Sequence, residues 1–201
     1  MAPDLPSDIP QARPLPLAWQ LVEAWFERSL QVRVLEDDPA SLLAYNLYHH
    51  RGREVPLRCG TVIRAGDPLL ELHFRREALA PLVQDGDPRR MGLALMQLGD
   101  RDVPRLARAL RDRPELQEVK AAHALTMFHR GITRYGFEVQ PIRERHLEWW
   151  FTTWQRILMA RDHAEGRKRV RKFRDRLVAR HIWASRETLL SRYCAGETER
   201  R

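Results

Sequence analysis

Residues 31–74 constrain the fold more than any other part of the chain, because their periodicity and their turn residues together predict paired β-strands. Side chains follow a two-residue period around Val32 and Val34 and again over residues 42–49. Turn signals divide the region at Asp37–Pro39, Arg51–Gly52, Cys59–Gly60 and Ala65–Pro68. Short runs punctuated in this way are typical of antiparallel strands. We therefore predict a small antiparallel sheet, with Gly60 and Gly66 at positive φ in tight turns.

Helical spacing dominates on both sides of this region. The predicted helices lie at residues 17–30, from Asp87–Pro88 onward, from Asp102 onward with Pro104 just inside, around 147–158, over the basic residues 166–180, and at 186–193 after a Ser185 cap. A strand is predicted at 180–184, before this cap. In the helix around 147–158, Trp150 and Trp154 share the apolar stripe and are predicted to be core. Trp149 lies off that stripe and is predicted to be exposed.

A strand, a short helix and a second strand are predicted between residues 116 and 141. Residues 119–125 form a plausible buried strand that includes His123, predicted to be a satisfied core histidine. The short helix at 128–135 is closed by Gly136 as its C-terminal cap, and a strand follows at 137–140. This order suits a right-handed crossover onto the sheet.

The whole chain is therefore predicted to form a single α+β domain over residues 17–193. Its parts are an N-terminal helix, a small antiparallel sheet and a helix-rich C-terminal half. Residues 1–16 are proline-rich and are predicted to be a disordered arm, and residues 194–201 a disordered tail.

Composition excludes several classes of protein. No run approaches the roughly 18–20 apolar residues that span a bilayer, and the N-terminus lacks the pattern of a signal peptide. The two cysteines, Cys59 and Cys194, do not suggest a disulfide framework. No histidine or cysteine spacing indicates a metal site, and no phosphate-binding or dinucleotide-binding loop indicates a cofactor. A cytoplasmic protein is predicted, with peripheral membrane contact as an open alternative.

Several motifs in order along the chain resemble one known family. They are Gly-Thr-Val-Ile-Arg-Ala-Gly-Asp at 60–67, Glu-Leu-His at 71–73, His-Arg-Gly at 129–131, Gly-Phe-Glu-Val at 136–139 and the closing segment Ser185–Tyr193. In this order they resemble the YkoP-like domain, over roughly residues 17–193. The resemblance implies a domain that occurs alone or fused to polysaccharide deacetylases, and it implies no catalytic residues. The metal-binding Asp and paired histidines of a deacetylase are not found in this chain.

The candidate site residues are therefore argued from their chemistry. Glu71 and His73 are two residues apart in a predicted strand, so both lie on the same face, where the carboxylate could orient the imidazole as a general base. His129 and Arg130 begin a short predicted helix after a strand and, with Arg134, suit an anion. The structural alternatives are a hydrogen-bonded strand-end histidine for His73 and a capping, salt-bridging pair for His129 and Arg130.

The net charge is concentrated at the C-terminal end of the chain. Residues 161–201 hold 13 basic and 6 acidic residues, whereas the other 160 residues hold 22 and 21. The predicted helix 166–180 could present a binding surface made by Arg167, Lys168, Arg171, Lys172 and Arg174. That surface could contact nucleic-acid phosphates or, with Phe173 inserted, an anionic membrane. The third interpretation is a solvated helix face.

These observations support three functional hypotheses. The leading hypothesis is an accessory protein of cell-envelope polysaccharide or lipid-linked sugar metabolism that binds an anionic or sugar ligand near His73, His129 and Arg130. The first alternative is a nucleic-acid-binding module that uses helix 166–180. The second alternative is an enzyme that uses Glu71 and His73 as a general base.

Overall fold

The computed structural model describes residues 33–35, 41, 43–75, 88–162 and 166–195. Its strands are β1 (Arg33–Val34), β2 (Leu43–His49), β3 (Val55–Pro56), β4 (Val62–Ile63), β5 (Pro68–Phe74), β6 (Ala121–Thr126), β7 (Glu138–Gln140) and β8 (Arg180–Ser185). Its α-helices are α3 (Pro88–Asp112), α4 (Arg145–Asp162), α5 (Gly166–Lys172) and α6 (Arg186–Tyr193). Three short 3₁₀ helices are η1 (Pro114–Leu116), η2 (Ile132–Tyr135) and η3 (Arg174–Arg176). The predicted N-terminal helix and arm lie outside the described residues.

The central sheet is mixed, so the prediction of a small antiparallel sheet is wrong. It has six strands in the order β1-β2-β5-β6-β8-β7, and β3 and β4 form a separate two-stranded hairpin. The pairing of β5 with β6 is parallel, whereas the other neighbouring pairs are antiparallel. Parallel neighbours need a long crossover, and the segment between β5 and β6 contains the 25-residue helix α3. The predicted strands near 119–125 and 137–140 are confirmed as β6 and β7, which lie on either side of β8.

Helix α3 is continuous, so the prediction that a new helix starts at Asp102 is wrong. The helix runs through Pro104, although a proline inside a helix removes one backbone hydrogen bond. Burial of its apolar face explains why the helix continues past Pro104, because Leu106 and Leu110, one turn apart, are both fully buried. Asp102 is also fully buried and holds an ion pair with Arg101, so its role is inside the helix and not at its start.

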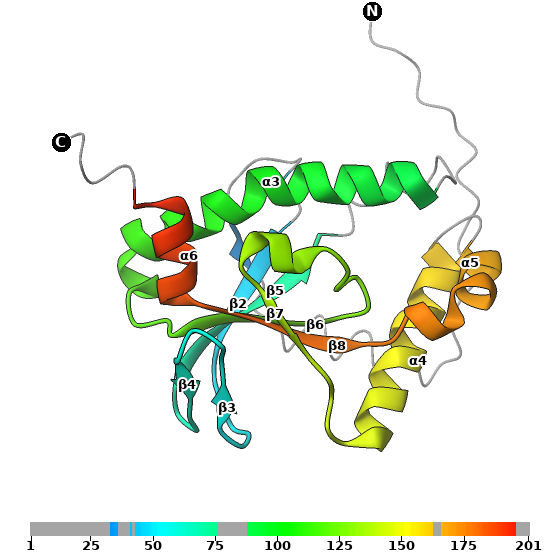
Figure 1. The fold of residues 1–201 in the computed structure, drawn as a ribbon, viewed down its shortest axis with the longest axis horizontal. Coiled ribbons are helices and arrows are strands. Elements are labelled where there is room, and N and C mark those ends of the chain that lie inside the picture. Colours follow the sequence, from blue (N-terminus) through cyan, green and yellow to red (C-terminus); the bar gives the residue numbers. More distant parts are fainter. Residues whose placement is uncertain (1–32, 36–40, 42, 76–87, 163–165, 196–201) are drawn as a thin grey trace, which may run out of the picture.

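One face of the sheet is apolar and carries the main core. Alternate residues of the strands, among them Leu70, Ala122 and Ile182, pack in one cluster with Leu106 of α3 and Leu189 of α6. Figure 1 shows α3 and α6 on this side of the sheet. Because side chains alternate between the two faces of a strand, every second residue is directed to the other side.

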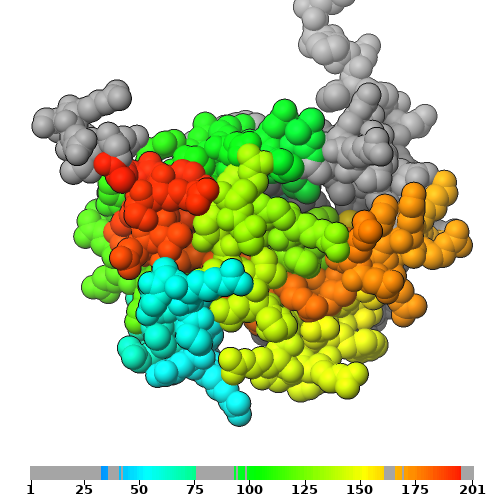
Figure 2. All heavy atoms as spheres, in the orientation of Figure 1, coloured from blue at the N-terminus to red at the C-terminus, as the bar shows by residue number. Residues whose placement is uncertain are grey.

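The opposite side of the sheet carries the β3–β4 hairpin toward one end and α4 toward the other (Figure 1). The hairpin packs Leu57 and Ile63 in a small cluster with Leu69 and Trp183. The turns before and after β4 confirm the sequence prediction, since Gly60 and Gly66 both have φ of 91°. In the space-filling view the hairpin is cyan and α4 is yellow, and they flank this side of the molecule (Figure 2).

Polar contacts hold helix α4 against the ends of β6 and β8. Gln155 accepts a hydrogen bond from the Met127 amide at 2.8 Å and donates one to the Leu125 carbonyl at 3.0 Å. Thr152 accepts one from the Ala179 amide at 3.0 Å. Of the tryptophans on α4, Trp149 is 66% exposed, as predicted, but Trp150 is 40% exposed, so the prediction that Trp150 belongs to the core is wrong.

The predicted basic helix at 166–180 is shorter than expected. Helix α5 ends at Lys172, η3 follows at Arg174–Arg176, and the chain joins the sheet as β8 at Arg180. The predicted strand at 180–184 is confirmed as β8, which pairs with both β6 and β7, so Arg180 belongs to the sheet and not to the helix. Helix α6 follows as predicted, with the Ser185 side chain accepting a hydrogen bond from the Thr188 amide at 3.0 Å. None of the described helices is long and apolar enough to cross a membrane.

Candidate functional site

The face of the sheet opposite the main core carries a row of polar and aromatic side chains. The strand register places Asn46 opposite Glu71, Glu71 opposite His123, and His123 opposite Trp183. Residues opposite one another on paired strands share a face, and residues two apart on one strand do too. Tyr48, His73 and His181 therefore belong to the same face. We call these seven residues the polar sheet face: Asn46, Tyr48, Glu71, His73, His123, His181 and Trp183.

Glu71, His73 and Asn46 form the first group on this face. Nε2 of His73 donates a hydrogen bond to Oδ1 of Asn46 at 2.5 Å and lies 3.6 Å from Oε2 of Glu71. The side chains of His73 and Glu71 are 25% and 29% exposed, so water and small solutes reach both. With Nε2 bonded, Nδ1 is the ring nitrogen left to accept a hydrogen bond. The predicted placement of Glu71 and His73 on one face is confirmed.

Tyr48, His123 and His181 form a hydrogen-bonded chain across three strands. The Tyr48 hydroxyl bonds to Nδ1 of His123 at 2.9 Å, and Nε2 of His123 bonds to Nδ1 of His181, also at 2.9 Å. Trp183 stacks on the His123 ring with 3.9 Å between ring centroids. His123 is buried with both nitrogens bonded, which confirms the prediction of a satisfied core histidine. In a neutral imidazole one nitrogen donates and the other accepts. The direction of the hydrogen bond between Tyr48 and His123 therefore determines the direction of the bond between His123 and His181.

Burial keeps the side chains of Tyr48, His123 and His181 uncharged. Desolvation, and then the charges of His181, His50 and His73, lower the pKa of His123 well below its usual value. Desolvation also lowers the pKa of His181, partly opposed by Glu144. The pKa of Tyr48 is raised, first by burial and then by the Glu71 carboxylate. At neutral pH the three residues are therefore linked to one another by neutral donors and acceptors.

These shifts predict that the protein loses stability in mild acid. The unfolded chain binds protons at His123 and His181 as the pH falls below about 6.5, whereas the folded chain resists them, so stability is complete above that pH and declines below it. We expect the free energy of unfolding to be about 1–2 kcal/mol lower at pH 5.5 than at pH 7.5. Urea titrations over this range measure the effect.

The matched comparison for this pH dependence uses two histidines of the sheet. The free energy of unfolding should vary less with pH in His123→Gln than in the wild type. It should vary as in the wild type in His49→Gln, because His49 is an exposed residue of β2. An unchanged slope in His123→Gln would assign the acid sensitivity to other groups.

His129 and Arg130 follow the carboxyl end of β6. The prediction that they begin a helix is wrong. They precede η2, which begins at Ile132 with Gly131 in the left-handed conformation at its N-cap. The rings of Phe74 and Phe128 contact each other edge to face, with centroids 6.1 Å apart, so the carboxyl ends of β5 and β6 meet and His73 and His129 share one end of the sheet. Burial, followed by the charges of Arg180 and Arg130, lowers the pKa of His129.

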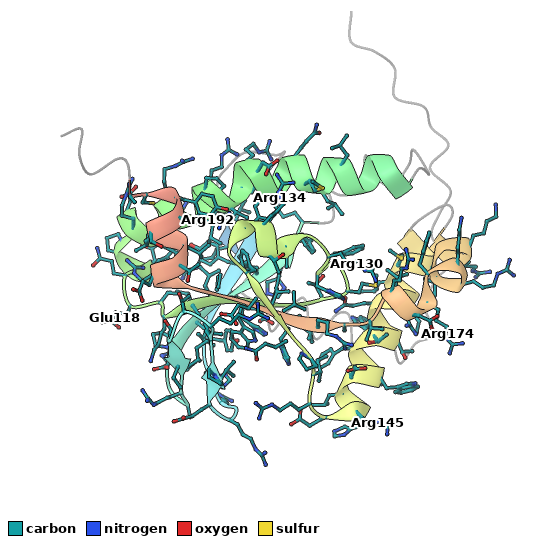
Figure 3. All side chains as sticks on the ribbon, viewed as in Figure 1. Glu118, Arg130, Arg134, Arg145, Arg174 and Arg192 are labelled. Carbon is teal, nitrogen blue, oxygen red and sulfur yellow. The ribbon has the colours of Figure 1, made fainter. Side chains whose placement is uncertain are left out.

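The structure separates Arg134 from the other predicted ligand-binding residues. Arg134 pairs with Asp100 of α3 at 3.1 Å, and its carbonyl accepts a hydrogen bond from Arg192 of α6 at 2.6 Å. Figure 3 shows Arg134 and Arg192 near α3 and α6, on the core side of the sheet, whereas Arg130 is directed toward the α5 side. A single site that joins Arg134 to Glu71 and His73 is therefore excluded by the fold.

The predicted basic surface lies on α5 and η3, beside α4. Arg167, Lys168, Arg171, Lys172 and Arg174 are all exposed. Phe173, the residue predicted to insert into a membrane, is half-buried and has the Lys172 ammonium 5.5 Å from its ring centre. Binding of nucleic acid or lipid by this surface stays a prediction.

Sequence reasoning missed Tyr48 and His181 as site residues. Their signal is a polar or aromatic residue in a strand whose neighbours are apolar, as in His-Ile-Trp at 181–183. That signal does not reveal that three strands distant in sequence align these side chains. Within the described ranges, no group of three or more His, Cys, Asp or Glu residues is arranged to hold a metal ion.

Fold and site together define a mixed α/β sheet domain with one apolar, helix-covered face and one polar face. A family model of the YkoP domain matches residues 13–193. An uncharacterised protein, YkoP, of Bacillus subtilis (strain 168) is 25% identical over 122 residues, which cover 60% of this chain and 67% of that protein. No solved structure matches the chain significantly. The chain therefore belongs to the YkoP family, as the motif resemblance had predicted.

Proposed function

We propose that this YkoP-family protein binds a carbohydrate on its polar sheet face, as an accessory protein of cell-envelope polysaccharide or lipid-linked sugar metabolism. The observation that carries the proposal is the partly exposed Glu71–His73 pair, set beside the neutral chain formed by Tyr48, His123 and His181. The metabolic context rests on the setting that the motif resemblance implies.

The chemistry of this face favours a sugar over an anion. A carboxylate and neutral imidazoles accept and donate hydrogen bonds to sugar hydroxyls. An anion placed there would be repelled by Glu71 and would meet His123 and His181 in their uncharged forms, because burial lowers the pKa of each. The earlier alternative of an anionic ligand at His73 is for this reason not retained.

A second candidate function is proton transfer to or from the bound ligand. The hydrogen bond from Nε2 of His73 to Asn46 favours it, since that bond orients the ring and leaves Nδ1 as the proton acceptor, with Glu71 3.6 Å from Nε2. Under this candidate, His73→Ala abolishes turnover of a sugar substrate while the protein remains folded.

The test is a titration with N-acetylglucosamine trimer, followed through the imidazole ¹⁵N resonances. We expect saturable shifts at His73, and binding weakened roughly 10-fold or more in His73→Ala and Glu71→Gln, as the loss of a charge-assisted hydrogen bond requires. His49→Ala is the matched control, because His49 is directed away from the polar sheet face. This variant should bind the trimer as the wild type does.

Two results would overturn the carbohydrate proposal. One is a saturable shift at His73 with inorganic phosphate and none with glucan or N-acetylglucosamine oligomers. The other is binding that is unchanged in both His73→Ala and Glu71→Gln. Circular dichroism of each variant separates loss of binding from loss of fold.

A further inference from the structure

An arginine-lined cavity lies on the other side of the sheet, at the C-terminal half of α3. It has a volume of about 260 Å³ and is lined by Leu35, Arg105, Arg108, Ala109, Asp112 and Arg113. The four helix residues, Arg105, Arg108, Ala109 and Asp112, are three, four and seven positions apart, which places them along one stripe of α3, and Arg113 directly follows the helix. The volume lies just below the roughly 300–1,000 Å³ of pockets for drug-sized ligands, so it suits a compact group.

The charge around this cavity is unbalanced. Asp102 pairs with Arg101 at 2.9 Å and with Arg105 at 3.6 Å. Asp112 accepts two hydrogen bonds from Arg111, at 2.7 Å and 3.1 Å. Both carboxylates of this part of α3 are therefore paired with other arginines, and in the described part of the chain neither Arg108 nor Arg113 has a carboxylate partner.

Arg113 is held in place by neutral oxygens. Its guanidinium donates to the Tyr45 hydroxyl at 3.1 Å and to the Leu35 carbonyl, and both Tyr45 and Leu35 are only 1% exposed. A guanidinium has five N–H donors, so donors remain after these two bonds. An arginine that is already oriented loses little entropy when it binds an anion, and the planar fork of its donors matches the oxygens of a phosphate group.

We propose that this cavity is a binding site for a phosphate group, held by Arg108 and Arg113. The site is independent of the polar sheet face, because Tyr45, which orients Arg113, lies on the core side of the sheet, next to Leu70 and Leu72. The phosphate group can belong to a soluble phosphorylated metabolite or to a lipid headgroup. The two sources share the same recognition chemistry, and the experiment separates them.

The first measurement is a titration of the full chain with inorganic phosphate at constant ionic strength, followed through the arginine Nε–Hε resonances, with chloride as the matched anion. We expect saturable shifts at Arg108 and Arg113 with phosphate and not with chloride. Arg108→Ala should weaken phosphate binding roughly 10-fold or more, as loss of a charge-assisted contact requires. Arg108 is the residue to change, because Arg113 also holds Tyr45 and Leu35.

Arg171→Ala is the control variant, since it removes the same charge from the exposed surface of α5. Phosphate binding that is equal in Arg108→Ala and in the wild type, or a chloride effect equal to that of phosphate, would overturn the proposal.

Parallel titrations use glucose 6-phosphate and vesicles of phosphatidylcholine with or without phosphatidic acid. Binding to the sugar phosphate alone identifies a soluble ligand, and vesicle binding lost in Arg108→Ala identifies a headgroup. Vesicle binding lost only in Arg171→Ala would overturn the headgroup source and assign lipid contact to α5.

Discussion

Trp183→Ala is expected to destabilise the protein by about 3–5 kcal/mol, the usual loss for truncating a large buried aromatic residue. The Trp183 side chain is 3% exposed, stacks on His123 and packs in one cluster with Leu57, Ile63 and Leu69. Its removal leaves a cavity between the β3–β4 hairpin and the sheet, so the hairpin should pack less tightly against the sheet. Urea unfolding followed by far-ultraviolet circular dichroism measures the effect.

Trp149→Ala provides the matched control for this prediction. It removes the same side chain from a site that is 66% exposed, and it should change the free energy of unfolding by less than about 0.5 kcal/mol. Equal losses in the two variants would contradict the packing described for Trp183.

Asp102→Ala is expected to cost about 3 kcal/mol, because it removes a fully buried carboxylate and leaves its partners without their counter-charge. Asp102 accepts hydrogen bonds from the Ser41 hydroxyl at 3.4 Å and from Nε of Arg101 at 2.9 Å. The first of these bonds connects the chain just before β2 to the middle of α3. Thermal and urea unfolding of the variant test the prediction.

The comparison for Asp102 is Asp100→Ala, one half-turn away on the same helix. Asp100 is 52% exposed and pairs with Arg134, so its loss should cost at most about 1 kcal/mol, as for other exposed ion pairs. If Asp102→Ala were no more damaging than Asp100→Ala, the buried carboxylate would have no special role in joining β2 to α3.

Structural features that depend on neighbouring residues in the sequence could be predicted from the sequence. The turns at Gly60 and Gly66 need positive φ, which glycine adopts without strain, and the Ser185 hydroxyl caps α6 through the Thr188 amide. The placement of Glu71 and His73 on one face followed from strand alternation alone.

Other features depend on partners that are remote in sequence and could not be read locally. Pro104 looks like the start of a helix, but the burial of Leu106 and Leu110 carries α3 through it. Residues 173–179 have helical spacing, yet α5 ends at Lys172 and a separate 3₁₀ helix, η3, follows at Arg174–Arg176. Arg134 lies five residues after His129, and it nevertheless pairs with α3 on the core side of the sheet.

The sequence by itself determined where most strands and turns lie, which histidine and carboxylate share a strand face, and which family the chain resembles, because each depends on neighbours along the chain. The tertiary structure alone decided that β6 pairs in parallel with β5, and this pairing places His123 between Glu71 and Trp183. It also decided that Arg108 and Arg113 line a cavity without carboxylate partners in the described ranges. Such arrangements arise from packing between distant segments, which burial of apolar surface selects and local periodicity does not encode.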